Sequence, residues 1–202
     1  MATLHTLPYW IFDMDGTLTV QNHNFDEMKR ALEVPEEEAH DMLRYIRSLP
    51  EKEAKEKHAW LLNYGLTKAA DSKPNRGAIE LLDYLTHEKG AKLGLLTRNN
   101  RNVALKTLEA IDALKYFEMD DILGRDEAAP KPDPDGILHL LNRWNGTPQK
   151  AVMVGDFTFD LNCGRNAGTS TILVNQPENF WPEITDFYFT DCAAILEHLT
   201  NS

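Results

Sequence analysis

The pattern of apolar and polar positions divides the chain into three stretches. Residues 9–12, with the sequence YWIF, form a short apolar run that is typical of a buried strand. Residues 24–71 show helical spacing and contain no convincing strand. From residue 73 onward, short apolar runs alternate with amphipathic stretches. The pattern therefore predicts one strand, then a helical block, then a regular alternation of helix and strand.

The helical block contains two predicted helices. Apolar residues recur with i, i+3, i+4, i+7 spacing at Ala39, Met42, Leu43 and Ile46. Pro35 and the three glutamates at 36–38 resemble the acidic first turn of this helix. A second helix is predicted to begin near Pro50 and to end at Gly65. Both helices carry little apolar surface, so we expect them to pack on each other and on another part of the chain.

The alternation after residue 73 predicts a sheet. Helices are expected at 78–85, 101–112, 134–145, 158–166 and 191–199, and strands at 91–97, 120–124, 151–156, 169–175 and 186–189. Continuous apolar strands separated by amphipathic helices indicate a mostly parallel sheet that is covered on both faces. We therefore expect a doubly wound, Rossmann-like α/β core made of residues 1–19 and 73–202. Residues 20–72 would be a small all-helical cap, inserted after the first strand through linkers at 19–23 and 72–76.

Composition and charge narrow the classes of function. The chain has 202 residues, of which 42% are hydrophobic and 26% charged, so a packed core is expected rather than disorder. The net charge of −11 argues against binding to nucleic acid or to an anionic membrane, because both need a basic face. An anionic substrate would have to be attracted by a local positive charge, such as a metal ion or a well-placed lysine.

The cysteines and the apolar runs bear on the compartment. Cys163 and Cys192 form no CxxC pair, and their spacing suits neither a disulfide scaffold nor a zinc site. We expect both to be free, partly buried thiols in a reducing compartment. The first ten residues do not resemble a signal peptide, and no apolar run approaches the roughly 20 residues of a membrane helix. The sequence thus favours a cytoplasmic protein, with monomer and dimer both open.

Chemically active side chains follow the predicted strands at their ends. These residues are Asp13 and Asp15 after the first strand, Thr97 after the second, and Asp156 and Asp160 after a later one; Lys131 lies in a proline-rich loop. Parallel strands present their carboxyl ends at one edge of the sheet, where ligands bind. Any one of these residues alone would most often be structural, for example a helix N-cap or a solvated lysine. The ordered set predicts a single functional site.

A cluster of carboxylates needs a cation, because neighbouring acids repel. A small number of hard oxygen ligands suits Mg²⁺, which keeps several waters and shares its ligands with a substrate phosphate. We expect Asp13 and Asp156 to bind Mg²⁺ directly and Asp160 to bind through water or to orient a neighbour. Asp15 could contribute its backbone carbonyl, which would leave its side chain free for chemistry.

Four motifs resemble those of the haloacid dehalogenase-like superfamily. They are DMDGTL at 13–18, LLT ending at Thr97, KP at 131–132 and GDFTFD at 155–160. The resemblance covers the first strand and residues 73–175. It is strongest to the branch of phosphoglycolate phosphatase and beta-phosphoglucomutase, whose small helical cap lies between the first two motifs. The chain departs from many members of this branch at 19–21, where it reads TVQ.

The resemblance implies a role for each motif. Asp13 would attack phosphorus and form an aspartyl-phosphate, and Asp15 would protonate the leaving alcohol and then deprotonate water. Thr97 and Lys131 would bind the phosphoryl oxygens, together with the backbone N–H groups of Met14 and Asp15. Arg98 and Asn99 are candidates for substrate contact. The implied enzyme is a Mg²⁺-dependent phosphatase that acts on a small phosphorylated metabolite.

Several alternatives remain at this stage. A phosphosugar mutase would use the same core residues. A non-enzymatic phospho-switch of the receiver type would lack both the inserted cap and a late GDxxxD motif, and an inactive binding protein would not need every core residue. Dehalogenation has no need of the second acid or of a metal, and phosphonate cleavage in this family replaces the residue at the position of Asp15. Turnover of a phosphomonoester would separate the enzymes from the binding proteins.

Overall fold

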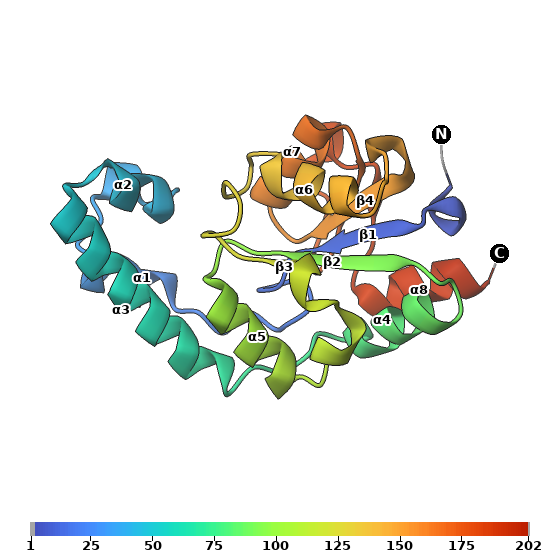
Figure 1. Ribbon diagram of the computed structural model, residues 1–202, viewed down its shortest axis with the longest axis horizontal. Coiled ribbons are helices and arrows are strands. Elements are labelled where there is room, and N and C mark those ends of the chain that lie inside the picture. Colours follow the sequence, from blue (N-terminus) through green and yellow to red (C-terminus); the bar gives the residue numbers. More distant parts are fainter. Residues whose placement is uncertain (1–2, 202) are drawn as a thin grey trace.

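The computed structural model describes residues 3–201. Its core is one parallel sheet with helices on both faces (Figure 1). The strands are β1 (Tyr9–Phe12), β2 (Lys92–Leu96), β3 (Ile122–Leu123), β4 (Ala151–Gly155), β5 (Ser170–Leu173) and β6 (Phe187–Tyr188). Their order in the sheet is β3-β2-β1-β4-β5-β6, and every pairing between neighbours is parallel. The chain therefore runs outward from β1 first to one edge and then to the other, which confirms the predicted doubly wound α/β core.

The core helices lie between the strands, as the alternating pattern predicts. They are α4 (Ala78–His87), α5 (Arg101–Ala110), α6 (Asp135–Arg143), α7 (Thr158–Ala167) and α8 (Cys192–Thr200). Short 3₁₀ turns occupy Leu4–Thr6, Glu36–Glu38, Leu114–Tyr116, Met119–Asp121, Pro148–Lys150 and Pro182–Ile184. In Figure 1, α6 and α7 cover one face of the sheet, and α4, α5 and α8 cover the other.

The central strand is apolar because both of its faces are buried. Trp10 and Phe12 pack into the apolar cluster that contains residues of α4, α5 and α8, whereas Ile11 packs into the cluster formed with α6 and α7. All three side chains are fully buried. Successive residues of a strand point to opposite faces, so a continuous apolar run is what a doubly covered strand requires.

The block between β1 and α4 is all-helical, as expected. It contains α1 (Phe25–Ala31), α2 (Met42–Ser48) and α3 (Glu51–Ala69). Leu32, Leu43, Ile46 and Leu61 form an apolar cluster of their own, separate from the two clusters on the sheet. In Figure 1 this helical insert extends from one end of the core. The division into a cap at 20–72 and a core on either side of it stays a prediction.

Two helix boundaries predicted from the sequence are wrong. The helix expected to begin at 36–38 is interrupted: Glu36–Glu38 form a 3₁₀ turn, and α2 begins only at Met42. Asp41 leaves the helical conformation, and its side chain accepts a hydrogen bond from the Arg44 N–H, so it acts as the N-cap. The second helix does not end at Gly65 but continues to Ala69.

Gly65 serves close packing rather than helix termination. A Cβ added at this position would lie 2.8 Å from Cγ2 of Val103 on α5. The missing side chain therefore allows α3 to approach α5 closely. Nearby, the Lys106 ammonium of α5 donates to the carbonyl of Leu66, 2.9 Å away. These contacts attach the end of the helical insert to the core.

Both cysteines are free, as predicted, but fully rather than partly buried. Burial is the main cause that raises the pKa of each thiol to about 12. Within residues 3–201, no helix is long and apolar enough to cross a membrane. The expected cytoplasmic location stays a prediction.

Candidate active site

The first strand delivers Asp13 to the carboxyl edge of the sheet. The Asp13 N–H still donates to the carbonyl of Val154 on β4, at 2.9 Å, so the sheet fixes its backbone. The chain then turns sharply at Gly16, where φ is 87°. A Cβ at Gly16 would also lie 2.3 Å from Oδ2 of Asp156. Glycine is required here both for the positive φ and for the close approach of the carboxylate.

Two asparagine side chains fix the turn that follows. The Asn75 amide donates to the carbonyls of Gly16, Thr17 and Thr19, at 3.0, 3.0 and 2.8 Å. The Asn175 amide donates to the carbonyls of Gly16 and Thr17, at 2.8 and 3.0 Å. Asn75 lies just after the helical insert and Asn175 just after β5. Distant parts of the chain thus hold the loop rigid beside Asp13 and Asp15.

Four of the predicted site residues meet around one buried point. Asp13, Asp156 and Asp160 each place a carboxylate oxygen within 4.8 Å of the others. The Lys131 ammonium lies 2.5 Å from Oδ1 of Asp13 and 2.6 Å from Oδ1 of Asp160. Oδ2 of Asp160 also accepts a hydrogen bond from the N–H of Phe157, the N-cap residue of α7. Both Asp13 and Lys131 are buried.

One ammonium does not neutralise this many acids. Burial, together with the charges of Asp160 and Asp15, raises the pKa of Asp13 from 3.8 to about 7, despite the opposing effect of Lys131. Burial and the charges of Asp13 and Asp160 raise the pKa of Asp156 from 3.8 to about 8. Burial alone would lower the pKa of Lys131, but Asp13 and Asp160 outweigh it and raise that pKa. The site therefore has an excess of buried negative charge.

The donor set suits a small divalent cation. The three clustered carboxylates offer hard oxygen ligands. The raised pKa values of Asp13 and Asp156 indicate that ionising these buried groups is unfavourable, and a bound cation would offset that unfavourable energy. The absent Cβ of Gly16 leaves room for Asp156 beside the loop. The residues that could hold the metal are Asp13, Asp156 and Asp160. Asp15 does not belong to this cluster through its side chain, and its predicted backbone contribution stays a prediction.

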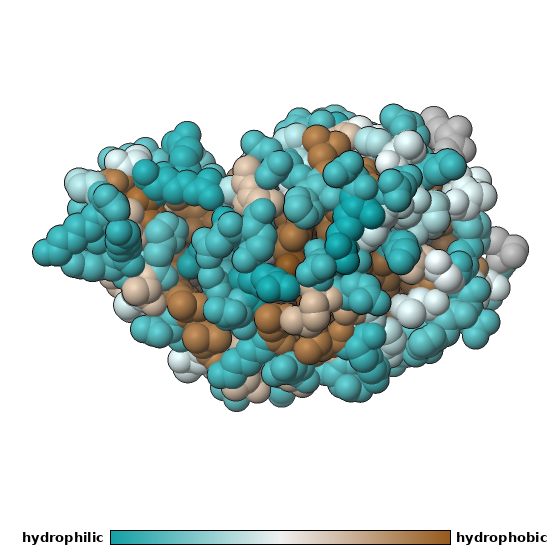
Figure 2. Space-filling view, viewed as in Figure 1, coloured by the Kyte–Doolittle hydropathy of each residue, from teal (hydrophilic) through white to brown (hydrophobic). Residues whose placement is uncertain are grey.

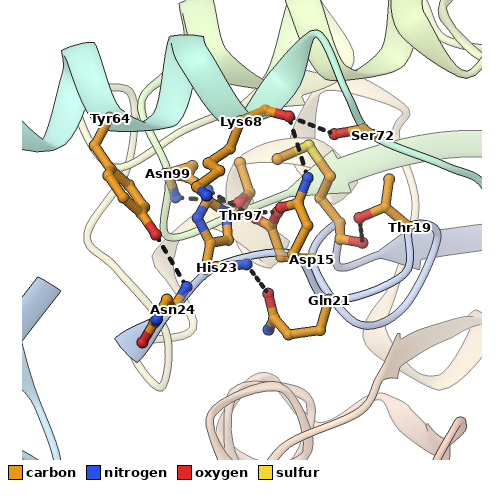
Figure 3. Close-up of polar contacts among 12 residues, drawn as sticks. Asp15, Thr19, Gln21, His23, Asn24, Tyr64, Lys68, Ser72, Thr97 and Asn99 are labelled. Atoms are coloured by element: carbon orange, nitrogen blue, oxygen red, sulfur yellow. Dashed lines mark hydrogen bonds and ion pairs between the residues drawn. The ribbon is translucent and has the colours of Figure 1, made fainter. Parts of the chain in front are cut away.

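The side chain of Asp15 is instead held by two other residues (Figure 3). The Nε2–H of His23 donates to Oδ1 at 3.0 Å, and the Asn99 amide donates to Oδ2 at 2.7 Å. His23 comes from the linker into the helical insert, and Asn99 follows Thr97 after β2. Asp15 is thus held at a fixed angle beside Asp13, with its side chain 20% exposed.

His23 is not among the site residues predicted from the sequence, because none of the four motifs contains it. In Figure 3 the ring points toward Asp15, while Tyr64 and Lys68 reach the same linker from α3. The Asn24 N–H donates to the Tyr64 hydroxyl at 2.9 Å, and the rings of His23 and Tyr64 are 5.8 Å apart. The usable signal was position: His23 lies in the short linker next to an acid motif.

The predicted phosphate-binding groups lie along the same edge. Thr97 is buried directly after β2, and its Oγ1 accepts a hydrogen bond from the Asn99 N–H at 3.1 Å. The Met14 side chain is buried in the core, so only its backbone faces the turn. Among the hydrogen bonds of residues 3–201, none uses the N–H of Met14 or of Asp15 as donor. These N–H groups are therefore free to bind an anion.

Arg98, a candidate for substrate contact in the sequence, reaches the helical insert. Its guanidinium pairs with Asp41, the N-cap residue of α2, and its Cζ lies 3.8 Å from the centre of the Phe159 ring. The side chains of Arg98 and Asp41 are only 19% and 16% exposed. Arg98 thus connects the loop after β2, the helical insert and α7.

The chain belongs to the haloacid dehalogenase-like hydrolases, because the family model matches residues 10–174. It is 31% identical, over 95% of its length, to an uncharacterized hydrolase of Saccharomyces cerevisiae, of which the alignment covers 90%. It is 26% identical to a pyrophosphatase, PpaX, of Listeria welshimeri, over 92% of this chain and 94% of that one. The chain is therefore a hydrolase of this family.

Solved structures share the fold. A hydrolase from Pseudomonas syringae superposes with a TM-score of 0.74 at 21% identity, covering 96% of this chain and 98% of that one. CbbY from Rhodobacter sphaeroides, solved in complex with phosphate, gives 0.73 at 22% identity, covering 94% and 96%. A putative phosphoglycolate phosphatase from Lactobacillus plantarum gives 0.73 at 19% identity, covering 95% and 99%. These likenesses confirm the α/β fold.

Proposed function

We propose that this hydrolase is a Mg²⁺-dependent phosphatase that cleaves a small phosphomonoester through an aspartyl-phosphate on Asp13. The observation that carries the proposal is the environment of the Asp13 carboxylate. It is buried at the strand end, paired with Lys131, next to Asp156 and Asp160, and followed by a separately held Asp15. Relatives named as phosphatases or pyrophosphatases support the same class of reaction.

Asp13 is the nucleophile in this proposal. Its carboxylate attacks phosphorus, and the bond from phosphorus to the leaving oxygen breaks. Asp15 donates a proton to that oxygen, and afterwards removes a proton from the water that attacks the phosphorus of the intermediate. His23 and Asn99 keep the Asp15 carboxyl in the position that both proton transfers need. Asp13 is regenerated when inorganic phosphate leaves.

Lys131, Thr97 and the N–H groups of Met14 and Asp15 would bind the phosphoryl oxygens and stabilise their charge in the transition state. Asp13, Asp156 and Asp160 would hold Mg²⁺. When bound, the ion would supply positive charge that reduces repulsion between the phosphate and the Asp13 carboxylate. The substrate would be a small phosphorylated metabolite, with neither nucleic acid nor membrane as a partner.

The direct test is hydrolysis of p-nitrophenyl phosphate and of inorganic pyrophosphate, each with Mg²⁺ and with excess EDTA. We expect phosphate release that depends on Mg²⁺ and is abolished by EDTA. Pyrophosphate is included because of the PpaX relatives. A protein that releases no phosphate from either compound, or from a panel of phosphorylated metabolites, would contradict the proposal.

A further inference from the structure

Arg125 is a buried cation without a partner. It follows β3, and only 8% of it is exposed. No hydrogen bond or ion pair joins its guanidinium to any residue of 3–201, and its Nε is fully buried. Among the lysines and arginines that the structure describes, it is the one that is both buried and unpaired. Burying a charge without a partner is costly, so this position calls for an explanation.

The other buried cations of the described chain show how the fold treats such groups. Lys131 contacts Asp13 and Asp160. Lys57, on α3, donates to the carbonyl of Leu32 at 2.5 Å and lies near two glutamates. The fold thus supplies anionic or carbonyl partners to these two lysines and none to Arg125. An anionic group of a bound molecule would give Arg125 the partner that the two buried lysines find within the chain.

Two further basic side chains lie near Arg125, on the helical insert. Arg47, on α2, is exposed, and His58, on α3, is half-buried. Neither forms an ion pair or hydrogen bond through its side chain within residues 3–201, and the Nδ1 of His58 is buried without a partner. Figure 2 shows the surface hollowed where the insert meets the core. The insert thus carries two basic groups without side-chain partners in the described chain, in a protein whose net charge is −11.

Arg125 is electrostatically coupled to Arg47 and to His58, which places the three groups in the same region of the protein. Burial lowers the pKa of Arg125, and so does Arg47. Burial and then the charge of Arg125 lower the pKa of His58, with a smaller contribution from Arg47. Asp126 opposes both effects, but it forms no ion pair with Arg125 in the described chain. One of its oxygens instead accepts a hydrogen bond from the Asn100 amide at 2.5 Å. The charge of Asp126 thus offsets more than the effect of Arg47 on Arg125, but it leaves the guanidinium without an ion-pair partner in the described chain.

This basic cluster is connected to the candidate active site through one residue. The Arg125 N–H donates to the carbonyl of Asn99 at 2.9 Å. The side-chain amide of the same Asn99 donates to Asp15. The loop that carries Arg125 therefore lies against the loop that follows β2 and contains Thr97. A molecule with its phosphoryl group at Asp13 could direct a second group toward Arg125.

We propose that Arg125, Arg47 and His58 form a second anion-binding site, which binds a phosphate or carboxylate group at the far end of the substrate. The inference rests on the proposed function, because the substrate is taken to be a phosphomonoester. The guanidinium of Arg125 would supply charged donors and His58 a neutral one. Arg47, from the insert, would close the site from the other side. The preferred substrates would then carry two anionic groups.

The test compares three short substrates: propyl phosphate, 1,3-propanediol bisphosphate and 3-(phosphonooxy)propanoate. We expect the wild-type enzyme to favour one or both of the doubly anionic compounds in kcat/KM. Arg125→Met and Arg47→Gln should each reduce that preference roughly 10- to 100-fold, as expected for loss of a charged hydrogen bond, while kcat/KM for propyl phosphate stays unchanged. The comparison between the bisphosphate and the carboxylate arms identifies which group is bound.

Lys92→Gln is the matched control. It also removes one unpaired cation, but Lys92 is exposed at the start of β2, at the opposite end of the sheet, so no preference should change. Equal preference in the wild type and both arginine variants would overturn the proposal. Arg47 is exposed, so its variant tests the site even if Arg125→Met folds poorly.

Calorimetric binding in EDTA separates this inference from the proposed function. The bisphosphate should bind wild-type protein at least about tenfold more tightly than it binds Arg125→Met, and propyl phosphate should not discriminate. If no compound is hydrolysed but this difference is found, the phosphatase proposal fails and the second site stands. If all compounds are hydrolysed and no binding difference exists, the second site fails and the phosphatase stands.

Discussion

The ring of His23 lies 3.0 Å from the Asp15 carboxylate, measured from Nε2 to Oδ1. The two residues belong to different parts of the protein, since Asp15 follows the central strand and His23 enters the helical insert. Only 8% of the His23 side chain is exposed. The position of the insert is therefore coupled directly to the orientation of the proposed acid and base.

Replacing His23 should lower turnover more than it affects substrate binding. We expect His23→Ala to reduce kcat roughly 10- to 100-fold, because a small displacement of a catalytic group has effects of that size. His23→Gln should recover part of the loss, since its amide can still donate to Asp15. Steady-state kinetics would separate kcat from KM, with His139→Ala, an exposed histidine on α6, as control. Equal losses in the Ala and Gln variants without recovery would argue against a positioning role.

Much of the sheet edge could be predicted because local patterns determine it. YWIF at β1, and the apolar runs of β2 and β4, identify buried parallel strands, and parallel strands align their carboxyl ends. The approach of Asp13, Asp156 and Asp160 follows from that geometry. Lys131 reaches them from a loop, which its order in the chain suggested. Their catalytic roles stay predictions.

The contacts between insert and core could not be predicted in the same way. Gly65 resembles a helix end in the sequence, and only the approach of Val103 explains why α3 continues through it. Asp41 interrupts an apolar periodicity that otherwise reads as one helix. The roles of His23 and Arg125 depend on neighbours that are distant in sequence. The local periodicity of the sequence does not predict such contacts, because they form between the helical insert and the α/β core.

Asp13→Asn should abolish turnover and leave the fold intact. An amide cannot act as the nucleophile, so the loss should amount to several powers of ten. The substitution also removes one charge from a group of buried acids, so the metal-free variant should melt at or above the wild-type temperature. Phosphate release and thermal unfolding would check both expectations. A variant that kept more than about a hundredth of the wild-type rate would not fit a covalent role for Asp13.

Mg²⁺ should stabilise the protein more at pH 8 than at pH 5. The pKa values of Asp13 and Asp156 are raised in the folded protein, from 3.8 to about 7 and about 8. Between pH 4 and 8 the folded state therefore binds more protons than the unfolded state, so these groups reduce stability as the pH rises. A bound cation offsets this loss where the carboxylates are ionised and competes with protons where they are not.

Thermal unfolding with Mg²⁺ and with EDTA, measured from pH 5 to pH 8, would check this expectation. In the Asp13→Asn variant, the stabilisation by Mg²⁺ should depend less on pH. Ca²⁺ should bind but inhibit turnover, because it prefers six to eight oxygens and would occupy both oxygens of Asp13. A stabilisation by Mg²⁺ that did not change with pH, or full activity with Ca²⁺ alone, would contradict the proposed ligands.

The pair formed by Arg98 and Asp41 should help to hold the insert against the core. Asp41→Asn keeps an N-cap for α2 but removes the charge that pairs with Arg98. Asp41→Ala removes both. We expect the Asp41→Asn variant to have an altered kcat/KM with little change in the free energy of unfolding. The Asp41→Ala variant should show the same change in kcat/KM and also lose about 1 kcal/mol of helix stability. Kinetics and urea unfolding of the two variants would separate the role of Asp41 in holding the insert against the core from its role as the N-cap of α2. Identical kinetics in the wild type and Asp41→Asn would exclude the first of these roles.

The last prediction separates a phosphatase from a phosphosugar mutase, since both would form phospho-Asp13. A phosphatase lets water reach the intermediate, with Asp15 as the base, whereas a mutase protects it until a sugar hydroxyl arrives. Asp15 is partly exposed and already held by two donors, an arrangement that suits the activation of water. We therefore expect phosphate to appear in step with substrate loss, and ¹⁸O from labelled water to enter it. The experiment incubates the enzyme with a small phosphomonoester and, separately, with glucose 1-phosphate, and follows phosphate and sugar-phosphate isomers. Rapid isomerisation of the sugar phosphate with almost no phosphate release would identify a mutase, with the same fold and the same nucleophile.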